Sequence, residues 1–238
     1  MASRPSWRDR AFVVRTYDFG EADRVIVLLT KDHGLVRGVA KGVRKSKSRF
    51  GSRLQPFVDV DVQVYPGRGL STITAADTVT YFGARIIDDF DRYAAACAVL
   101  ETAEKLSYDE ADPALFALVE GALENLQTDQ HPTMVLDAFI LQATEHAGWG
   151  LSLFNCANCG APGPHKAFNA AVGGAVCNNC RPPGSLDVER ETLHDMWLMQ
   201  RGSPVSSQRA AQIHRATVAH LQFNLETGLK SLKIMEQA

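Results

Sequence analysis

The sequence predicts an α+β protein of several domains: an N-terminal five-stranded β-barrel of the OB type, then an α-helical domain that contains an inserted four-cysteine zinc knuckle. Three observations predict this fold class. About the first eighty residues hold short β-branched, apolar runs separated by turn signals, and the apolar side chains after them recur at helical spacing. Two Cys-x2-Cys pairs then interrupt the helical part.

Residues 1–79 are assigned to the barrel. The clearest strand signal lies at 58–64, where valines alternate with Asp59, Asp61 and Gln63, so that one face is apolar and the other is polar. Five strands fit the OB type in number and length, although periodicity alone does not separate this type from other small barrels. The expected strands cover residues 11–17, 24–30, 35–40, 57–65 and 70–77.

Helices are expected on both sides of the cysteine pairs, with the first part of the helical domain at 80–153 and its C-terminal part at 184–238. Asp112 is a candidate N-cap, with Pro113 in the first helical position, and Gly148 is expected to end a later helix. The tail is expected to be helical from Leu186 onward. Its apolar residues predict one continuous helix stripe, formed by Ile213, Thr217, Leu221, Leu225, Leu229 and Leu232.

Four of the five cysteines form the pattern expected of a metal site, in a segment assigned to residues 154–183. The two-residue gap in each pair lets both thiolates face one centre, and two such pairs supply the tetrahedral sulfur shell that Zn²⁺ prefers. Because four thiolates fill this shell, we interpret the zinc as structural. Two disulfides or four free thiols are the alternatives, and His165 could replace one ligand. The predicted ligands are Cys156, Cys159, Cys177 and Cys180.

The formal net charge of −2 conceals two opposed blocks of charge. Eight basic side chains lie within residues 31–53, where only Asp32 is acidic. Residues 77–137 instead carry thirteen acidic side chains, and the basic ones among them are Arg85, Arg92 and Lys105. This asymmetry indicates two functional surfaces rather than one uniformly mixed surface.

The basic block is expected to neutralise nucleic-acid phosphates and so to bind without reading sequence. Small residues between its cations suggest a flexible connection between two strands, and Phe50 could stack on a base. Arg8, Arg10 and Arg15 would extend this surface if they lie beside it. A loop that only aids solubility, or one that binds an acidic protein, is the alternative. The predicted contacts are Lys41, Arg44, Lys45, Lys47, Arg49, Phe50 and Arg53.

The sequence gives little support for an enzyme. It lacks the H-E-x-x-H pattern of metalloproteases, the complete nucleophile elbow of hydrolases and the spacing of a phosphate-binding loop. It also shows no signal-peptide core and no apolar run long enough to cross a membrane. We therefore expect a cytoplasmic protein that is not an enzyme and has no membrane partner.

The order of several motifs resembles the bacterial RecO family of DNA-repair and recombination-mediator proteins, from Phe12 to Met235. The resemblance rests on Gly20–Glu21, Thr30–Gly34, Ala40–Gly42, the basic run at 44–49, Leu54–Phe57, the two cysteine pairs and Leu229–Met235. It implies an OB fold, a helical domain and a zinc knuckle. It also implies that the DNA contacts include Arg37, Lys41, Arg44, Lys45, Lys47 and Arg49.

The resemblance further implies binding to single- and double-stranded DNA, annealing of complementary strands, and association with the nucleoid. It implies help in loading recombinase onto strands coated with single-strand-binding protein, together with a RecR-type partner protein. Family members contact the acidic tail of single-strand-binding protein through the helical domain, which is itself acidic in this chain. A zinc-ribbon adaptor that binds RNA or an acidic protein is the alternative function, and a metal-dependent hydrolase is a third.

Overall fold

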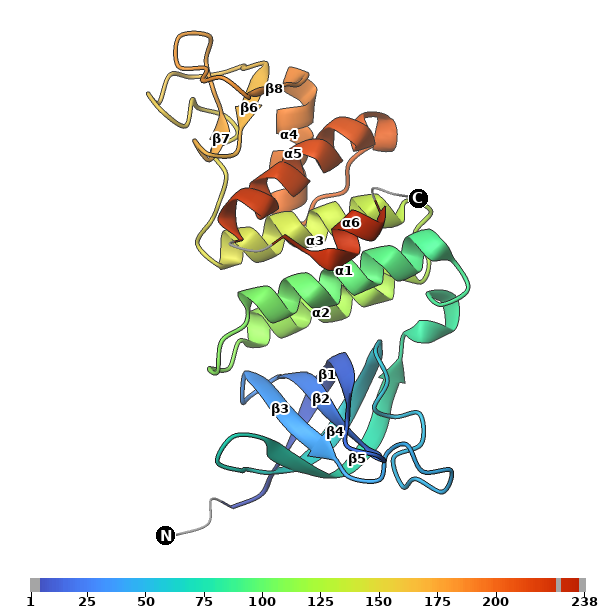
Figure 1. Cartoon of the computed structure of the whole chain (residues 1–238). Helices are drawn as coiled ribbons and strands as arrows, with labels where there is room; N and C mark the ends of the chain where they lie inside the picture. The colour runs from blue at the N-terminus through green and yellow to red at the C-terminus, as the bar shows by residue number, and fades with distance from the viewer. Residues whose placement is uncertain (1–4, 226–227, 236–238) are drawn as a thin grey trace.

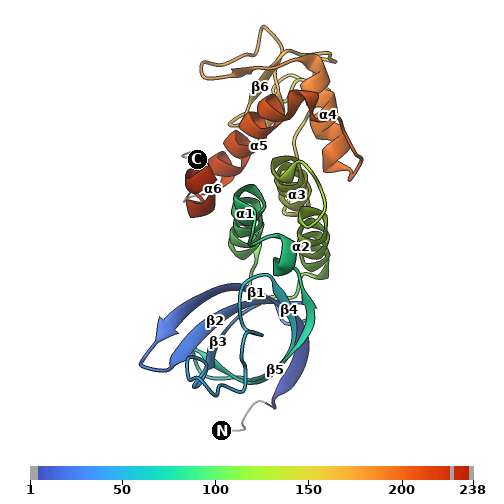
Figure 2. The ribbon, with the colours of Figure 1, turned by 90° about the vertical axis from the view of Figure 1, so that its right-hand side faces the viewer.

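The computed structural model describes residues 5–225 and 228–235. Its first five strands close into a barrel in the order β1-β2-β3-β5-β4, with β4 paired back onto β1. Neighbouring strands are antiparallel except β3 and β5, which are parallel, and Figure 2 shows the closed ring. Closure gives each of these five strands a partner on both sides. The strands are β1 (Trp7–Phe19), β2 (Asp23–Thr30), β3 (Leu35–Ala40), β4 (Val58–Tyr65) and β5 (Ser71–Tyr81).

The helical domain follows, and the fold class predicted from the sequence is confirmed. β5 runs to Tyr81, so the barrel continues past residue 79, where we expected it to end. Asp112 caps α2 by accepting the Leu115 N–H at 2.9 Å, with Pro113 beginning the helix as predicted. The helices are α1 (Phe90–Leu106), α2 (Pro113–Leu126), α3 (Pro132–His146), α4 (Arg190–Gln200), α5 (Ala210–Asn224) and α6 (Lys230–Met235), with short 3-10 turns η1 (Gly83–Arg85) and η2 (Ser207–Arg209).

The barrel and the knuckle lie at opposite ends of an elongated molecule, with the helices between them (Figure 1). α3 is the central helix because it packs against α1, α2, α4 and α5. The knuckle contains a small sheet in the order β7-β6-β8, formed by β6 (Ala167–Asn169), β7 (Gly174–Ala175) and β8 (Leu186–Asp187). Within the described ranges, every helix is too short or too polar to cross a membrane.

β2 and the middle of β1, from Ala11 to Val14, are buried on both faces, which explains why these stretches read as unbroken apolar runs. Val13, Ile26 and Leu28 point into the barrel, whose core also contains the alternating valines of β4. Their neighbours Phe12 and Val27 point the other way and join the core of α1 and α2. One surface of the barrel is therefore part of the helical core rather than solvent-exposed.

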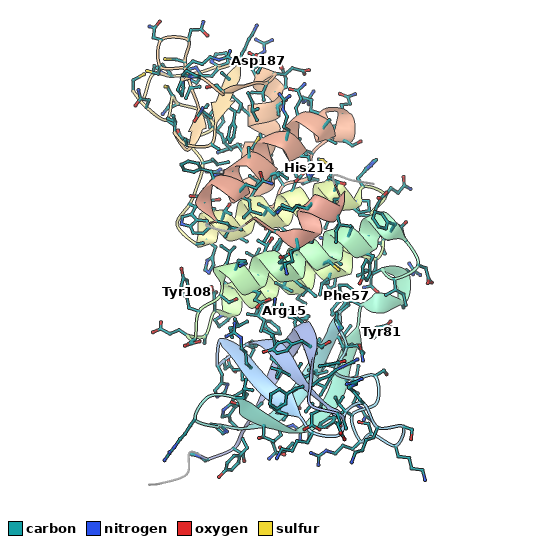
Figure 3. All side chains as sticks on the ribbon, viewed as in Figure 1. Arg15, Phe57, Tyr81, Tyr108, Asp187 and His214 are labelled. Carbon is teal, nitrogen blue, oxygen red and sulfur yellow. The ribbon has the colours of Figure 1, made fainter. Side chains whose placement is uncertain are left out.

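Aromatic side chains hold this seam between barrel and helices. The rings of Phe12 and Phe116 lie 4.6 Å apart, and Phe57 meets Tyr93 edge to face at 5.6 Å. Arg15 and Phe57 lie on the barrel side of the seam in Figure 3. At its edge, Gly34 has a positive φ, and a Cβ there would lie 2.5 Å from the carbonyl oxygen of Glu110, so only glycine allows this approach.

The predicted continuous stripe in the C-terminal tail is wrong. α5 ends at Asn224, Leu225 is extended, and α6 begins at Lys230; residues 226–227 lie outside the described ranges. Glu101 of α1 accepts hydrogen bonds from the N–H groups of Lys230 and Ser231 at 3.0 and 2.9 Å, and from the Ser231 hydroxyl at 2.6 Å. A carboxylate at the start of a helix compensates its free N–H groups, so this contact fixes α6 against α1. The expected helix at Leu186–Asp187 is instead strand β8.

A buried carboxyl group of α3 pairs with a histidine of α5 and so joins the two helices. Asp137 of α3 is fully buried, and its carboxylate lies 2.9 Å from Nδ1 of His214 on α5. Burial raises the pKa of Asp137, and the hydrogen bond with His214 opposes that shift. A second pair, His146 with Asp112, has the same 2.9 Å separation but is exposed.

Replacing His214 with Ala should lower the free energy of unfolding by about 2–4 kcal/mol, because it leaves a buried carboxylate without its partner. The matched change His146→Ala removes an exposed pair and should cost less than about 1 kcal/mol. Urea denaturation at neutral pH measures both. Equal losses in the two variants would contradict the importance we give to burial.

Candidate nucleic-acid interface and metal site

The basic loop between β3 and β4, residues 41–57, closes one end of the barrel. Val43, Phe50 and Leu54 are 9%, 1% and 0% exposed, and all three belong to the barrel core. The loop is also tied to the β1–β2 turn, since the Arg44 N–H donates to the carbonyl oxygen of Ala22 at 3.0 Å. These buried side chains anchor the loop at three points, while residues 44–49 between them are exposed or half-buried, so the flexibility of that stretch stays a prediction.

Phe50 is one of these anchors and is not exposed for stacking. Its ring lies in the barrel core, and the Arg49 guanidinium covers it at 4.8 Å from the ring centroid. The expectation that Phe50 stacks on a base is therefore wrong for this conformation. The ring instead stabilises the loop that carries the cations, since burying a side chain of this size contributes about 1.5–3 kcal/mol.

The other predicted contacts are all exposed. Two of them form ion pairs: Arg44 lies 3.3 Å from Asp18, and Arg37 lies 3.9 Å from Glu104. The rest have no carboxylate within ion-pair distance in the described part of the chain, and these unpaired loop cations are Lys41, Lys45, Lys47, Arg49 and Arg53. The loop thus displays positive charge that the protein does not neutralise.

Arg8 and Arg10 do not extend this surface. The Arg8 side chain lies 2.8 Å from each of Asp61 and Asp77, so its charge is more than balanced. Arg10 lies between Asp59 and Glu120 at the seam, and these contacts raise the pKa of Arg10. Two of the three arginines expected to extend the basic surface therefore have a structural role.

The charge of Arg15, unlike that of Arg8 and Arg10, is only partly balanced, because Arg15 shares one carboxylate with Arg37. Both guanidinium groups face Glu104, at 2.7 and 3.9 Å, which leaves one positive charge in excess. Arg24 and Arg44 share Asp18 in the same way, at 3.0 and 3.3 Å. The outer side of β1, β2 and β3 therefore carries both signs of charge, because Glu21 and Asp23 also lie at the β1–β2 turn, and the clear positive excess is that of the loop.

Two exposed aromatic residues of β1 were missed by the sequence reasoning. Tyr17 and Phe19 are 43% and 47% exposed. The strand register places Tyr17 opposite Val25, which is in turn opposite Val39 of β3, so these side chains share the outer face of the sheet. In the sequence, Arg15, Tyr17 and Phe19 occupy every second position, which indicates one face of a strand. The pattern was missed because the expected strand ended at Tyr17.

The knuckle brings all four predicted ligand cysteines together. Their sulfur atoms lie within 4.8 Å of one another, and Cys159 and Cys177 are 3.9 Å apart. Four sulfurs about 2.3 Å from a central ion would be separated by about 3.8 Å, so the cluster fits a tetrahedral metal ion. The cysteines are free, and the alternative of two disulfides does not hold. These four residues could hold a metal: Cys156, Cys159, Cys177 and Cys180.

Backbone hydrogen bonds favour the thiolate form of Cys156 in this cluster. The N–H groups of Cys177 and Cys159 point to the Cys156 sulfur and lower its pKa to about 6, which favours the thiolate that metals bind. His165 instead lies with Nε2 3.0 Å from the carbonyl oxygen of Ala161, outside the sulfur cluster. Cys97 is on α1, in the helical core.

Two family models match the chain. The one described as recombination protein O N terminal matches residues 1–82, and the one described as recombination protein O C terminal matches residues 87–233. The break between them falls next to η1, where the barrel ends and the helices begin. The first region contains the basic loop and the second contains the four-cysteine cluster.

Purified protein should carry one metal ion per chain, and Cys156→Ser should lose it because one of four ligands is gone. Cys97→Ser is the matched control, since it removes a cysteine outside the cluster and should keep the metal. Elemental analysis by mass spectrometry measures both. Equal metal content in the two variants would show that the cluster does not bind it.

Proposed function

This chain belongs to the recombination protein O (RecO) family, and we propose that it is a DNA-binding recombination mediator in DNA repair. In this proposal it binds single- and double-stranded DNA and promotes annealing of complementary strands. It also helps to load recombinase onto strands coated with single-strand-binding protein. The observation that carries the proposal is the set of unpaired cations on a loop that buried side chains hold in place.

The charge distribution supports contact with DNA through one side of the barrel. The loop cations Lys41, Lys45 and Lys47 are exposed and lack carboxylate partners among the described residues. The neighbouring face of β1 adds Tyr17 and Phe19, whose rings can stack on unpaired bases. Barrels of the OB type use this combination of a strand face and adjoining loops for oligonucleotides.

Annealing follows from electrostatics. Two complementary strands repel each other, and a surface with excess positive charge lowers that repulsion by replacing condensed counterions. Phosphate contacts carry no sequence information, so the strands can move until their bases are in register. Annealing forms no covalent bond, and the proposed role therefore needs no catalytic residue.

We further propose that the four-cysteine cluster holds a structural Zn²⁺. A closed shell of four thiolates leaves no position for water, which catalytic zinc requires. The strands of the knuckle are only two or three residues long, so they bury little by themselves. A metal would supply the stability that a larger core provides elsewhere.

Family membership also supports partners that the charges alone do not locate. We propose a RecR-type partner protein and the acidic tail of single-strand-binding protein, with activity at the nucleoid where DNA is found. The first part of the helical domain, before the knuckle, is a poor electrostatic match for an acidic tail. Arg92, for example, is held by Asp89 at 3.6 Å and by the carbonyl oxygen of Leu126.

The double substitution Lys45→Gln/Lys47→Gln should weaken binding to oligothymidylate and make it less sensitive to salt. Each lost contact with a single strand changes the slope of log K against log[salt] by about 0.7, so the two together should reduce it by about 1.4. Fluorescence anisotropy between about 50 and 200 mM salt measures the slope. Arg8→Gln, whose charge is already balanced, is the control and should leave the slope unchanged.

An unchanged slope in the double variant would remove the loop from the binding surface. Complementary oligonucleotides then test the wider function: wild-type protein should accelerate their annealing, and the double variant should do so less. A zinc-ribbon adaptor that binds RNA or an acidic protein would not accelerate annealing. Turnover of a substrate that is lost with the metal would instead indicate a hydrolase.

A further inference from the structure

Aromatic and cationic side chains gather where α4 meets the knuckle, far from the barrel. Phe154 lies just before the first metal-binding pair and is 50% exposed. Its ring is edge-to-face with Trp197 at 4.9 Å and with His194 at 6.2 Å, and His194 is stacked against Trp197 at 5.8 Å. The three rings form one contiguous surface, which we call the ring cluster.

The helix and the knuckle fix the ring cluster in place. His194 and Trp197 are three residues apart and lie on one face of α4, and Arg201 is the C-cap residue at the end of this helix. Phe154 is held from the other side, because Leu153 is buried against α4 and Cys156 is anchored in the sulfur cluster. Rings that are already ordered lose little conformational entropy when a ligand binds.

The ring cluster has a cation and a cavity beside it. The Arg201 guanidinium lies 4.2 Å from the centroid of the Trp197 ring, and no carboxylate in the described residues pairs with it. On the other side, a cavity of about 560 Å³ is lined by Phe154, His194, His165 and the prolines at 162 and 164. The volume is in the range of small-ligand sites.

We propose that the ring cluster is a stacking site for the bases of single-stranded nucleic acid, separate from the barrel. Exposed flat rings with a neighbouring guanidinium are the chemistry that binds unpaired bases without sequence preference. Bases stack on Phe154 and His194, Trp197 supports the rings from beneath, and Arg201 faces a phosphate. This inference rests on the proposed function, in which the chain binds single-stranded DNA.

Binding at the ring cluster would depend on stacking more than on charge, unlike binding at the loop. The loop offers several unpaired cations, whereas the ring cluster offers only Arg201, because Arg190 is bound to Glu191 at 2.7 Å. Binding at the ring cluster therefore depends weakly on salt, with a slope of about −0.7 for one phosphate contact. Because the barrel and the knuckle are at opposite ends of the molecule (Figure 1), one protein could hold two segments of strand.

The test uses the full chain and a fluorescein-labelled oligothymidylate of about eight nucleotides. At about 200 mM salt, where phosphate-driven binding is weakened, Phe154→Ala should reduce affinity about 5- to 150-fold. Phe223→Ala is the matched control, because Phe223 is 58% exposed on α5 outside the ring cluster, and it should bind as wild type does. Unchanged metal content confirms that the knuckle of Phe154→Ala is folded.

Ultraviolet crosslinking of the same oligonucleotide, mapped by mass spectrometry, gives a second readout. Crosslinks at Phe154 or His194 that persist in Lys45→Gln/Lys47→Gln support the proposal. Wild-type affinity in Phe154→Ala, with crosslinks confined to the barrel, overturns it and leaves the proposed function intact. Absence of binding by wild-type protein at both low and high salt overturns both.

Discussion

The structure depends on one constraint: β2 and the middle of β1 are buried on both faces, one face in the barrel and the other in the helical core. Phe12 packs against Phe116 while its neighbour Val13 points into the barrel. A barrel with one side covered in this way cannot rotate against the helices. The surface of the barrel away from the helices stays exposed, and it includes the end of β1, the loop and the second half of β5.

The placement of carboxylates divides the arginines into two groups. Arg8 and Arg10 each face two acidic side chains, so they stabilise the barrel and the seam without adding positive field. Arg15 and Arg37 instead share Glu104, and the loop lysines have no such partner among the described residues. The formal net charge of −2 therefore does not predict whether the protein binds a polyanion, since local pairing of charges decides where a polyanion can bind.

Periodicity and cysteine spacing were sufficient to predict the barrel, the helices and the four clustered cysteines, because each depends on local sequence. The valines of β4 had to face inward, and two Cys-x2-Cys pairs needed one centre. The prediction for Phe50 was wrong because an aromatic residue among cations looks exposed, and only closure of the barrel shows that the loop plugs its end. The separate start of α6 was missed because a contact that fixes it comes from Glu101, more than a hundred residues away in sequence.

The knuckle adds a second consequence of long-range structure. Its own hydrophobic cluster is small, formed by Cys156, Ala167 and Val176, and four thiolates around a metal would add rigidity by another route. Phe154 lies beside the first of these cysteines and meets Trp197 of α4, so the order of the sulfur cluster is transmitted to an exposed ring. In the stacking site that we propose, the sulfur cluster would therefore help to order the aromatic surface that receives a base.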